Sequence, residues 1–183
     1  MGKAGLVVAG SGSGPSMPTV GFILKRRLNG TGGWSKSMGG ADGTTGSFLS
    51  SAGIDDAGRV AVGGAVKTSE EQGFDFALRR YAAGGGFLNG VQLAGTNEAQ
   101  DTCWALRLVP GGTVYATGTV DHMVTNGDVR TLAYSRTWTL VINRGYDSPT
   151  HGEDGGQSLA VTSGAVYVAG KSAGDAWLIK YER

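Results

Sequence analysis

Apolar and polar residues alternate along this chain in short runs that end in glycine. Four segments carry such a run: residues 4–10, 58–64, 112–118 and 164–170. An alternation with a period of two is typical of a β-strand with one buried face. No window carries the i, i+3, i+4 spacing of an amphipathic helix. The pattern therefore predicts a chain built of short β-strands.

The four runs recur at a regular spacing. Their closing glycines are Gly10, Gly64, Gly118 and Gly170, which lie 54, 54 and 52 residues apart. Each run is followed by a polar loop, a second strand, a short turn, a third strand, and then a long loop before a last apolar strand. Each full repeat thus predicts four strands, within a single domain that spans residues 1–183. The repeats cover approximately residues 1–46, 47–100, 101–155 and 156–183.

A four-stranded repeat of this length is the unit of a β-propeller blade. We therefore expect an all-β fold, a β-propeller built of four-stranded antiparallel blades, with about three and a half blades per chain. The 34 glycines among 183 residues fit this fold. Glycine allows turns with positive φ and lets neighbouring strands approach closely, so its abundance needs no ligand to explain it.

The residues of the repeats resemble those of a known protein family. Residues 112–118 followed by 128–134, and residues 74–81 (Phe-Asp-Phe-Ala-Leu-Arg-Arg-Tyr), resemble bacterial β-propeller repeats of the SBBP and delta-60 kind. Those repeats combine a Gly-x-Val-Tyr-Val-x-Gly strand, an Asp-x-Phe strand, a turn and an aromatic-led strand. The resemblance covers nearly the whole chain and implies the fold, but no catalytic motif. The third repeat departs from it, since its second turn is shortened to residues 135–137 and it lacks the Asp-Phe pair.

The resemblance also implies the phase of the repeats, because in that family the glycine-closed strand is the second of each blade. The chain then holds three, four, four and three strands, so that the first blade lacks its inner strand and the last lacks its outer strand. Three arrangements fit: an excerpt from a longer ring, four blades of which two are incomplete, or a ring completed by another chain. Open strand edges bind partners. We therefore expect self-association, as a homodimer that completes a ring.

The charge balance narrows the class of partner. Sixteen Lys and Arg against fifteen Asp and Glu give a net charge of +1, which argues against nucleic acid or an anionic membrane as partner. No apolar run approaches the roughly 20 residues that span a bilayer, and no signal peptide is recognisable. We expect a soluble chain. Resembling repeats often belong to surface or secreted bacterial proteins, which leaves an extracellular or cell-surface place within a longer chain open.

The long loops fall into two sets that lie on one face of a propeller. They join the second strand to the third (11–19, 67–73, 121–128) and one repeat to the next (39–47, 94–101, 145–156). Long loops on a rigid scaffold usually carry the binding residues. We expect a protein or carbohydrate ligand on this face. The candidate ligand-binding residues are Asp101, Trp104, Asp121, His122, Asp128, Asp147, His151, Glu153 and Asp154.

Two sets of these residues have a second interpretation. His122 and His151 lie among carboxylates, which suits a divalent metal. The spacing matches no metal-binding motif, however, so solvated loop residues are favoured and no metal or cofactor is expected. Asp101 and Asp154 occupy the same place in successive repeats, where the first repeat has Ser47. They form either a ring of acceptors near the axis or, as we favour, caps of their own loops.

The sequence favours a non-catalytic scaffold or binding module, because no catalytic signature accompanies the repeats. The alternative is a hydrolase- or lyase-like enzyme with acidic and histidine residues of the loop face around a central pocket. Its discriminating segment is the non-repeating loop 145–156. Cys103 is interpreted as a small buried thiol rather than a nucleophile. The expected core residues are Leu6, Val60, Val114, Val166, Leu24, Leu78, Leu132, Trp34, Phe87 and Trp138.

Overall fold

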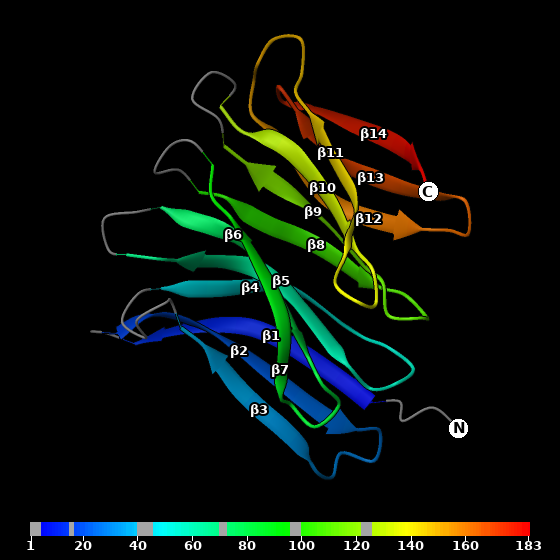
Figure 1. Ribbon diagram of the computed structural model, residues 1–183. Coiled ribbons are helices and arrows are strands. Elements are labelled where there is room, and N and C mark those ends of the chain that lie inside the picture. Colours follow the sequence, from blue (N-terminus) through cyan, green and yellow to red (C-terminus); the bar gives the residue numbers. More distant parts are fainter. Residues whose placement is uncertain (1–4, 15–16, 40–45, 70–72, 96–99, 122–125) are drawn as a thin grey trace.

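The computed structural model of the chain describes residues 5–14, 17–39, 46–69, 73–95, 100–121 and 126–183. These residues form fourteen antiparallel strands in four small sheets and no helix (Figure 1). Strands that follow one another in the sequence are neighbours in each sheet. The prediction of an all-β chain is confirmed. The described part of the chain accordingly contains no helix that is long and apolar enough to cross a lipid bilayer.

The strands are grouped as three, four, four and three. The first sheet consists of β1 (Gly5–Gly14), β2 (Met17–Arg27) and β3 (Gly33–Met38). The second consists of β4 (Ser47–Ile54), β5 (Val60–Lys67), β6 (Phe74–Tyr81) and β7 (Phe87–Leu93). The third consists of β8 (Thr102–Leu108), β9 (Val114–Val120), β10 (Asp128–Tyr134) and β11 (Leu140–Tyr146). The fourth consists of β12 (Asp154–Val161), β13 (Ala165–Ser172) and β14 (Asp175–Glu182). This is the grouping that the phase of the repeats predicts.

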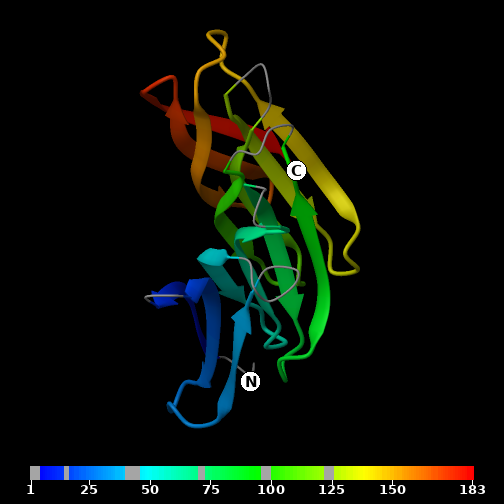
Figure 2. The same cartoon turned by 90° about the vertical axis from the view of Figure 1, so that its left-hand side faces the viewer.

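The sheets follow one another from β1–β3 at one end of the molecule to β12–β14 at the other (Figures 1 and 2). The first strands of the later sheets, β4, β8 and β12, are called the inner strands below. Each inner strand contacts two strands of the preceding sheet, here called its leading strands, which are β1 and β2 or the strands that correspond to them: β5 and β6, or β9 and β10. The strands β8 and β12 also contact the inner strand before them, β4 and β8 respectively. One packing relation is therefore used three times. The described residues do not close into a barrel or a propeller.

Buried side chains fill the three spaces between successive sheets. Between the first and second sheets lie Ile23, Met38, Leu49, Val60, Val62 and Tyr81. Between the second and third lie Ala61, Phe76, Leu78, Cys103, Leu106, Val114, Ala116, Val120, Leu132 and Tyr134. Between the third and fourth lie Ala105, Tyr115, Val129, Ala133, Leu159, Val166 and Val168. The stability of the fold thus depends on contacts between sheets, because each sheet alone leaves an apolar face in water.

The closing glycines lie beside a β-bulge in the inner strand. The register between the inner strand and its neighbour shifts at the same place in three sheets. The residues that the pairing skips are Ser50, Trp104 and Gln157. A Cβ added to Gly64, Gly118 or Gly170 would lie 1.9 or 2.0 Å from a backbone oxygen of the inner strand. The recurrence of glycine at these positions therefore has a steric cause.

Three of the expected core positions need correction. Val60, Val114 and Val166 are buried as predicted, but the equivalent Leu6 is 59% exposed, because no described sheet covers that face of β1. Phe87 is 60% exposed, since it lies on an outer strand and meets only the edge of a neighbouring ring.

The pattern predicts that Trp138 opens a strand, but the residue is half-buried and lies before the strand that begins at Leu140. It has a φ of 66° in the turn before β11 and stacks on Tyr134, with ring centroids 4.8 Å apart. Of the remaining positions, Leu78 and Leu132 are buried, whereas Leu24 and Trp34 are half-buried.

Candidate functional site

The strand ends that border the two sets of long loops lie along one edge of the row of sheets, here called the long-loop edge. Asp101 precedes β8, and its N–H donates to the carbonyl oxygen of Phe74 at 2.6 Å, at the start of β6. In the same way the N–H of Asp154 donates to the carbonyl oxygen of Gly127 at 2.9 Å, just before β10. The starts of β8 and β12 are thus bonded to the start of the third strand of the preceding repeat.

Ser47 and Asp101 cap the loops beside them at equivalent positions. Both are buried, with 0% and 1% of their surface exposed. The hydroxyl of Ser47 donates to the carbonyl oxygen of Met38, where its own loop begins, and accepts the N–H of Gly21 on β2 at 2.9 Å. Both carboxylate oxygens of Asp101 accept backbone N–H groups, Oδ2 from Gly95 and Oδ1 from Asp121 at 2.6 Å. This is the capping role that the sequence favours for this position.

Asp154 has the same position in the fourth sheet, but only half of these bonds. It is fully buried, and its Oδ2 accepts the N–H of Ser148 at 2.6 Å. Its Oδ1 is buried and has no hydrogen-bond partner among the described residues. The donor that Asp121 gives to Asp101 is missing here because β13 and β14 join through the two-residue turn 173–174 instead of a long loop. The shorter loop leaves one buried carboxylate oxygen unsatisfied.

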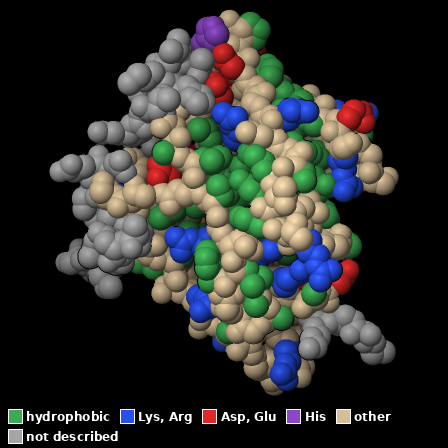
Figure 3. Space-filling view, viewed as in Figure 1, with side chains coloured by type: hydrophobic (Ala, Val, Ile, Leu, Met, Phe, Trp, Pro, Cys, Tyr) green, Lys and Arg blue, Asp and Glu red, His purple; other side chains and the backbone are tan. Residues whose placement is uncertain are grey.

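Three carboxylates, one of them that of Asp154, lie close together here. Asp128 begins β10, Asp147 follows β11, and Asp154 begins β12; one carboxylate oxygen of each lies within 4.8 Å of the other two. The Oδ2 of Asp147 contacts Nδ1 of His151 at 2.7 Å. Acidic side chains also gather beside a histidine at the upper end of the face in Figure 3. Like charges held together away from water are unfavourable unless a proton or a cation compensates them.

The aromatic candidate, Trp104, lies on the same edge and projects from the bulge of β8. Its side chain is 43% exposed, and its Nε1 donates to Oγ1 of Thr119 at 3.3 Å. Its ring centroid lies 6.4 Å from that of Phe48, which in turn lies 5.3 Å from that of Phe74. The bulge therefore turns a tryptophan outward next to two further rings, a surface suited to stacking on an apolar or sugar face.

The remaining predicted residues are less closely associated with the cluster. Glu153 forms an exposed ion pair with Lys171, with Nζ and Oε1 2.7 Å apart. The N–H of Asp121 is used by Asp101, and its own Oδ1 is buried without a hydrogen-bond partner in the described part of the chain. His122 lies outside the described residues. Of the two predicted histidines, only His151 is thus placed beside the carboxylates.

Burial sets the chemistry of two titratable groups near this edge. Desolvation raises the pKa of Asp101, although the hydrogen bonds from Asp121 and Gly95 lower it in part. Desolvation also raises the pKa of the fully buried Cys103 thiol far above its ordinary value. A thiol with such a pKa remains protonated, so Cys103 is a packing residue and not a nucleophile.

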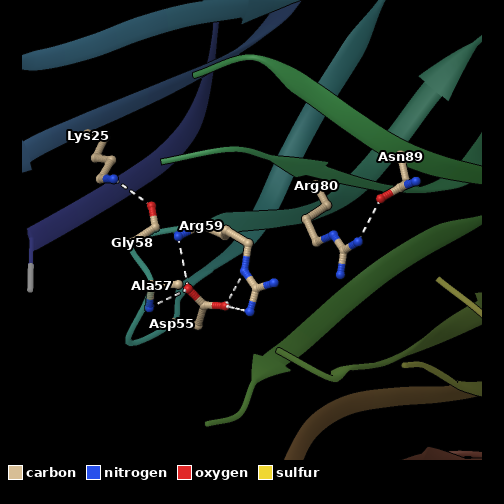
Figure 4. Close-up of polar contacts among 7 residues, drawn as sticks. All are labelled: Lys25, Asp55, Ala57, Gly58, Arg59, Arg80 and Asn89. Carbon is tan, nitrogen blue, oxygen red and sulfur yellow. Dashed lines mark hydrogen bonds and ion pairs between the residues drawn. The ribbon is translucent and has the colours of Figure 1, made fainter. Parts of the chain in front are cut away.

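The opposite edge carries short turns, some of whose polar contacts are drawn in Figure 4, and a basic hollow. Nζ of Lys25 donates to the carbonyl oxygens of Gly58 and Ala83, at 2.5 and 2.9 Å. Asp55 and Arg59 form an ion pair of 2.6 Å within one turn. A surface hollow of about 640 Å³ lies here, far from the carboxylates. The lysine of the hollow, Lys25, donates to carbonyl groups of the second sheet and so joins the first sheet to the second. Its charge therefore has a structural role.

Arg80 on β6 is a charged residue that lies between the second and third sheets. It is only 5% exposed. Its Nη2 donates to Oδ1 of Asn89 at 2.7 Å, and the guanidinium lies over the ring of Trp138, 5.0 Å from the centroid (Figure 4). Burial, followed by the nearby charge of Arg59, lowers the pKa of Arg80. The aliphatic stem of Arg80 therefore packs between the second and third sheets. The alternation of apolar and polar residues along the strand does not reveal this packing.

The sequence therefore identified the members of the carboxylate cluster but did not predict that they lie close together. Asp128, Asp147 and Asp154 were predicted as separate loop residues, and the unsatisfied oxygen of Asp154 was missed. The available signal was the short loop 171–175, which stands where earlier repeats have long ones. In comparisons with known proteins, no family model and no curated protein matches the chain.

Proposed function

We propose that the protein is a non-catalytic scaffold and binding module, an arc of a β-propeller whose long-loop edge carries the ligand contacts. The observation that supports this most is the threefold use of one packing relation, in which each inner strand contacts the two leading strands before it. Repetition of a single relation with a constant turn leads to a ring. The resemblance of the repeats to bacterial propeller repeats agrees with this interpretation.

The chemistry of the edge favours binding over catalysis. Cys103 is buried with a raised pKa, and both oxygens of Asp101 are occupied by backbone N–H groups. Neither is therefore available as a nucleophile or a general base. Trp104, by contrast, is exposed beside two further aromatic rings. We propose a carbohydrate or a protein segment as the ligand that stacks on it.

We further propose that a second copy of the chain covers the two outward faces of the row. In the first sheet Leu6, Val8 and Phe22 are 59%, 42% and 44% exposed. Their face is equivalent to the one that Val60 uses to pack on the preceding sheet. In the fourth sheet Leu178 is 68% exposed.

The two faces are of complementary kinds, because inside the molecule one kind always packs on the other. The Leu178 face of one copy can therefore cover the Leu6 face of a second, and the Leu6 face of the first can receive the Leu178 face of the second. A two-fold axis allows both contacts at once. Exposed apolar side chains gathered on a sheet face are typical of such an interface.

The mass of the assembly in solution tests this arrangement. We expect the wild-type chain, at micromolar concentration, to give twice the chain mass of 18.7 kDa by light scattering. Leu6→Asp and Leu178→Asp should each give a single chain mass. Leu28→Asp is the matched control, because Leu28 is 75% exposed in a turn and on neither face. A single chain mass for the wild type would refute the proposal.

A further inference from the structure

We propose that Asp128, Asp147 and Asp154 bind one divalent cation, and that Ca²⁺ is the preferred ion. The site goes beyond the scaffold function. It lies where the third sheet meets the fourth, since Asp128 begins β10 and Asp154 begins β12. A cation there would join two sheets and fix the start of the long loop between them.

The oxygens lie close enough together to share one ion. One oxygen from each carboxylate lies within 4.8 Å of the other two. Ca²⁺ binds oxygen ligands at about 2.3–2.6 Å and accepts irregular sets of protein oxygens. Mg²⁺ demands near-ideal octahedral geometry at about 2.0–2.1 Å and usually keeps several waters, so a site of three carboxylates from separate strands favours Ca²⁺. The three groups are all carboxylates, which favours a hard ion over zinc.

An independent observation is the unsatisfied oxygen of Asp154. This side chain is fully buried, and its Oδ1 has no hydrogen-bond partner among the described residues. The equivalent Asp101 has both oxygens satisfied by backbone N–H groups. The fold therefore does not require a carboxylate oxygen without a donor at this position. A buried acceptor without a donor is costly, and a charged one more so. A cation facing Oδ1 supplies the missing partner.

The neighbouring groups hold the other two carboxylates in place. Nδ1 of His151 contacts Oδ2 of Asp147 at 2.7 Å, while Oδ1 of Asp147 is buried without a hydrogen-bond partner in the described ranges. Gly127, with a φ of 104°, accepts the N–H of Asp154 and so brings the start of β10 to the start of β12. The imidazole therefore orients Asp147 and leaves its second oxygen for the ion.

Thermal unfolding of the full chain tests the site. The protein is freed of metal with a chelator, dialysed, and melted with CaCl₂, MgCl₂ or ZnCl₂. At Ca²⁺ concentrations about a hundredfold above the dissociation constant, we expect the midpoint to rise by about 5 to 10 °C. Isothermal titration calorimetry should give one Ca²⁺ per chain. Tighter binding of Mg²⁺ or Zn²⁺ than of Ca²⁺ would overturn the assignment of the ion.

Three variants separate a ligand from a merely structural carboxylate. Asp154→Asn and Asp147→Asn should weaken Ca²⁺ binding at least about tenfold, because ligand charge sets the affinity of such sites. Asp147 is partly exposed, with 30% of its side chain accessible, so this variant should fold even if Asp154→Asn does not. Asp101→Asn is the matched control; it should melt lower with and without Ca²⁺ and keep the full Ca²⁺ shift.

Two results would refute the site. One is a wild-type midpoint that does not respond to Ca²⁺; the other is an equal response in Asp147→Asn. The test is independent of the proposed assembly, because the mass measurement is made on the same samples in chelator. Loss of the Ca²⁺ response with an unchanged assembly mass, or the reverse, identifies which of the two proposals fails.

Discussion

Leu178 occupies in β14 the place that Leu78 occupies in β6, yet the two have opposite environments. Each pairs with the residue that precedes the closing glycine of the adjacent strand, Gly63 for Leu78 and Ala169 for Leu178. Leu78 is 1% exposed because the third sheet covers it, whereas Leu178 is 68% exposed. The same local sequence logic thus gives a core residue in one sheet and a surface residue in another, depending on which sheet lies beside it.

The packing between the second and third sheets should not tolerate a charge. Val114 is 1% exposed in that core, so Val114→Asp would bury a carboxylate without a partner and should cost more than about 4 kcal/mol. We expect an insoluble or unfolded protein by circular dichroism. Val141→Asp is the control, since Val141 is 56% exposed on β11. Cooperative unfolding of Val114→Asp at the wild-type midpoint would contradict the assignment of this core.

The closing glycine of the third repeat should be irreplaceable even by alanine. In Gly118→Ala the new Cβ would lie 1.9 Å from the backbone oxygen of Thr102, so the inner strand must move. We expect a loss of about 1–3 kcal/mol or more in the free energy of unfolding, measured by urea denaturation. Gly164→Ala, where the structure leaves open space, should change it by less than about 0.5 kcal/mol. Equal effects of the two substitutions would argue against the close approach.

Arg80 should stabilise the fold through the packing of its aliphatic stem rather than through its charge. The guanidinium is buried over Trp138, and its Nε and Nη1 have no hydrogen-bond partner among the described residues. Arg80→Met keeps the stem and removes the buried charge, so its stability should stay within about 1 kcal/mol of the wild type or exceed it. Arg80→Ala should lose about 2 kcal/mol or more, because it also removes the packing. Denaturation curves in which both variants lose equally would show that the charge itself is needed.

The buried Asp101 should make stability depend on pH with a definite sign. Its pKa is raised above the ordinary value of 3.8, chiefly by desolvation, so the folded protein binds this proton more tightly than the unfolded chain. Stability contributed by this group is therefore greatest below pH 3.8 and falls as the pH rises through the raised pKa.

Asp101→Asn cannot titrate, which isolates this effect. The variant should be less stable at every pH, because its amide NH₂ group, which cannot accept a hydrogen bond, would face one of the two backbone N–H groups that the oxygens of Asp101 accept. The stability gap to the wild type should narrow as the pH rises above 3.8. Unfolding free energies of both proteins between pH 3 and 7 measure the gap. A gap that widens with pH would mean that hydrogen bonding to the charged form outweighs desolvation.

The strands could be predicted from the sequence because their determinants are local. Alternation marked each strand, and Gly64, Gly118 and Gly170 marked the position where the backbone of the preceding inner strand comes within 2.0 Å of where a Cβ would lie. The resemblance then supplied the phase, and with it the grouping of strands into sheets. The candidate residues Asp128, Asp147 and Asp154 were also found, since carboxylates in loops are visible in any sequence.

The environment of these residues was decided only by the tertiary structure. Leu6 and Val60 have equivalent strand positions, but only Val60 has a preceding sheet to cover it. Asp101 and Asp154 have equivalent loop positions, but Asp154 lacks a second N–H donor, because a two-residue turn stands where the earlier repeat has a long loop. The distance between carboxylates on β10, after β11 and on β12 depends on how two sheets dock. A sequence specifies periodicity and turn chemistry residue by residue, whereas burial and the meeting of distant charges arise from packing between segments that the sequence keeps apart.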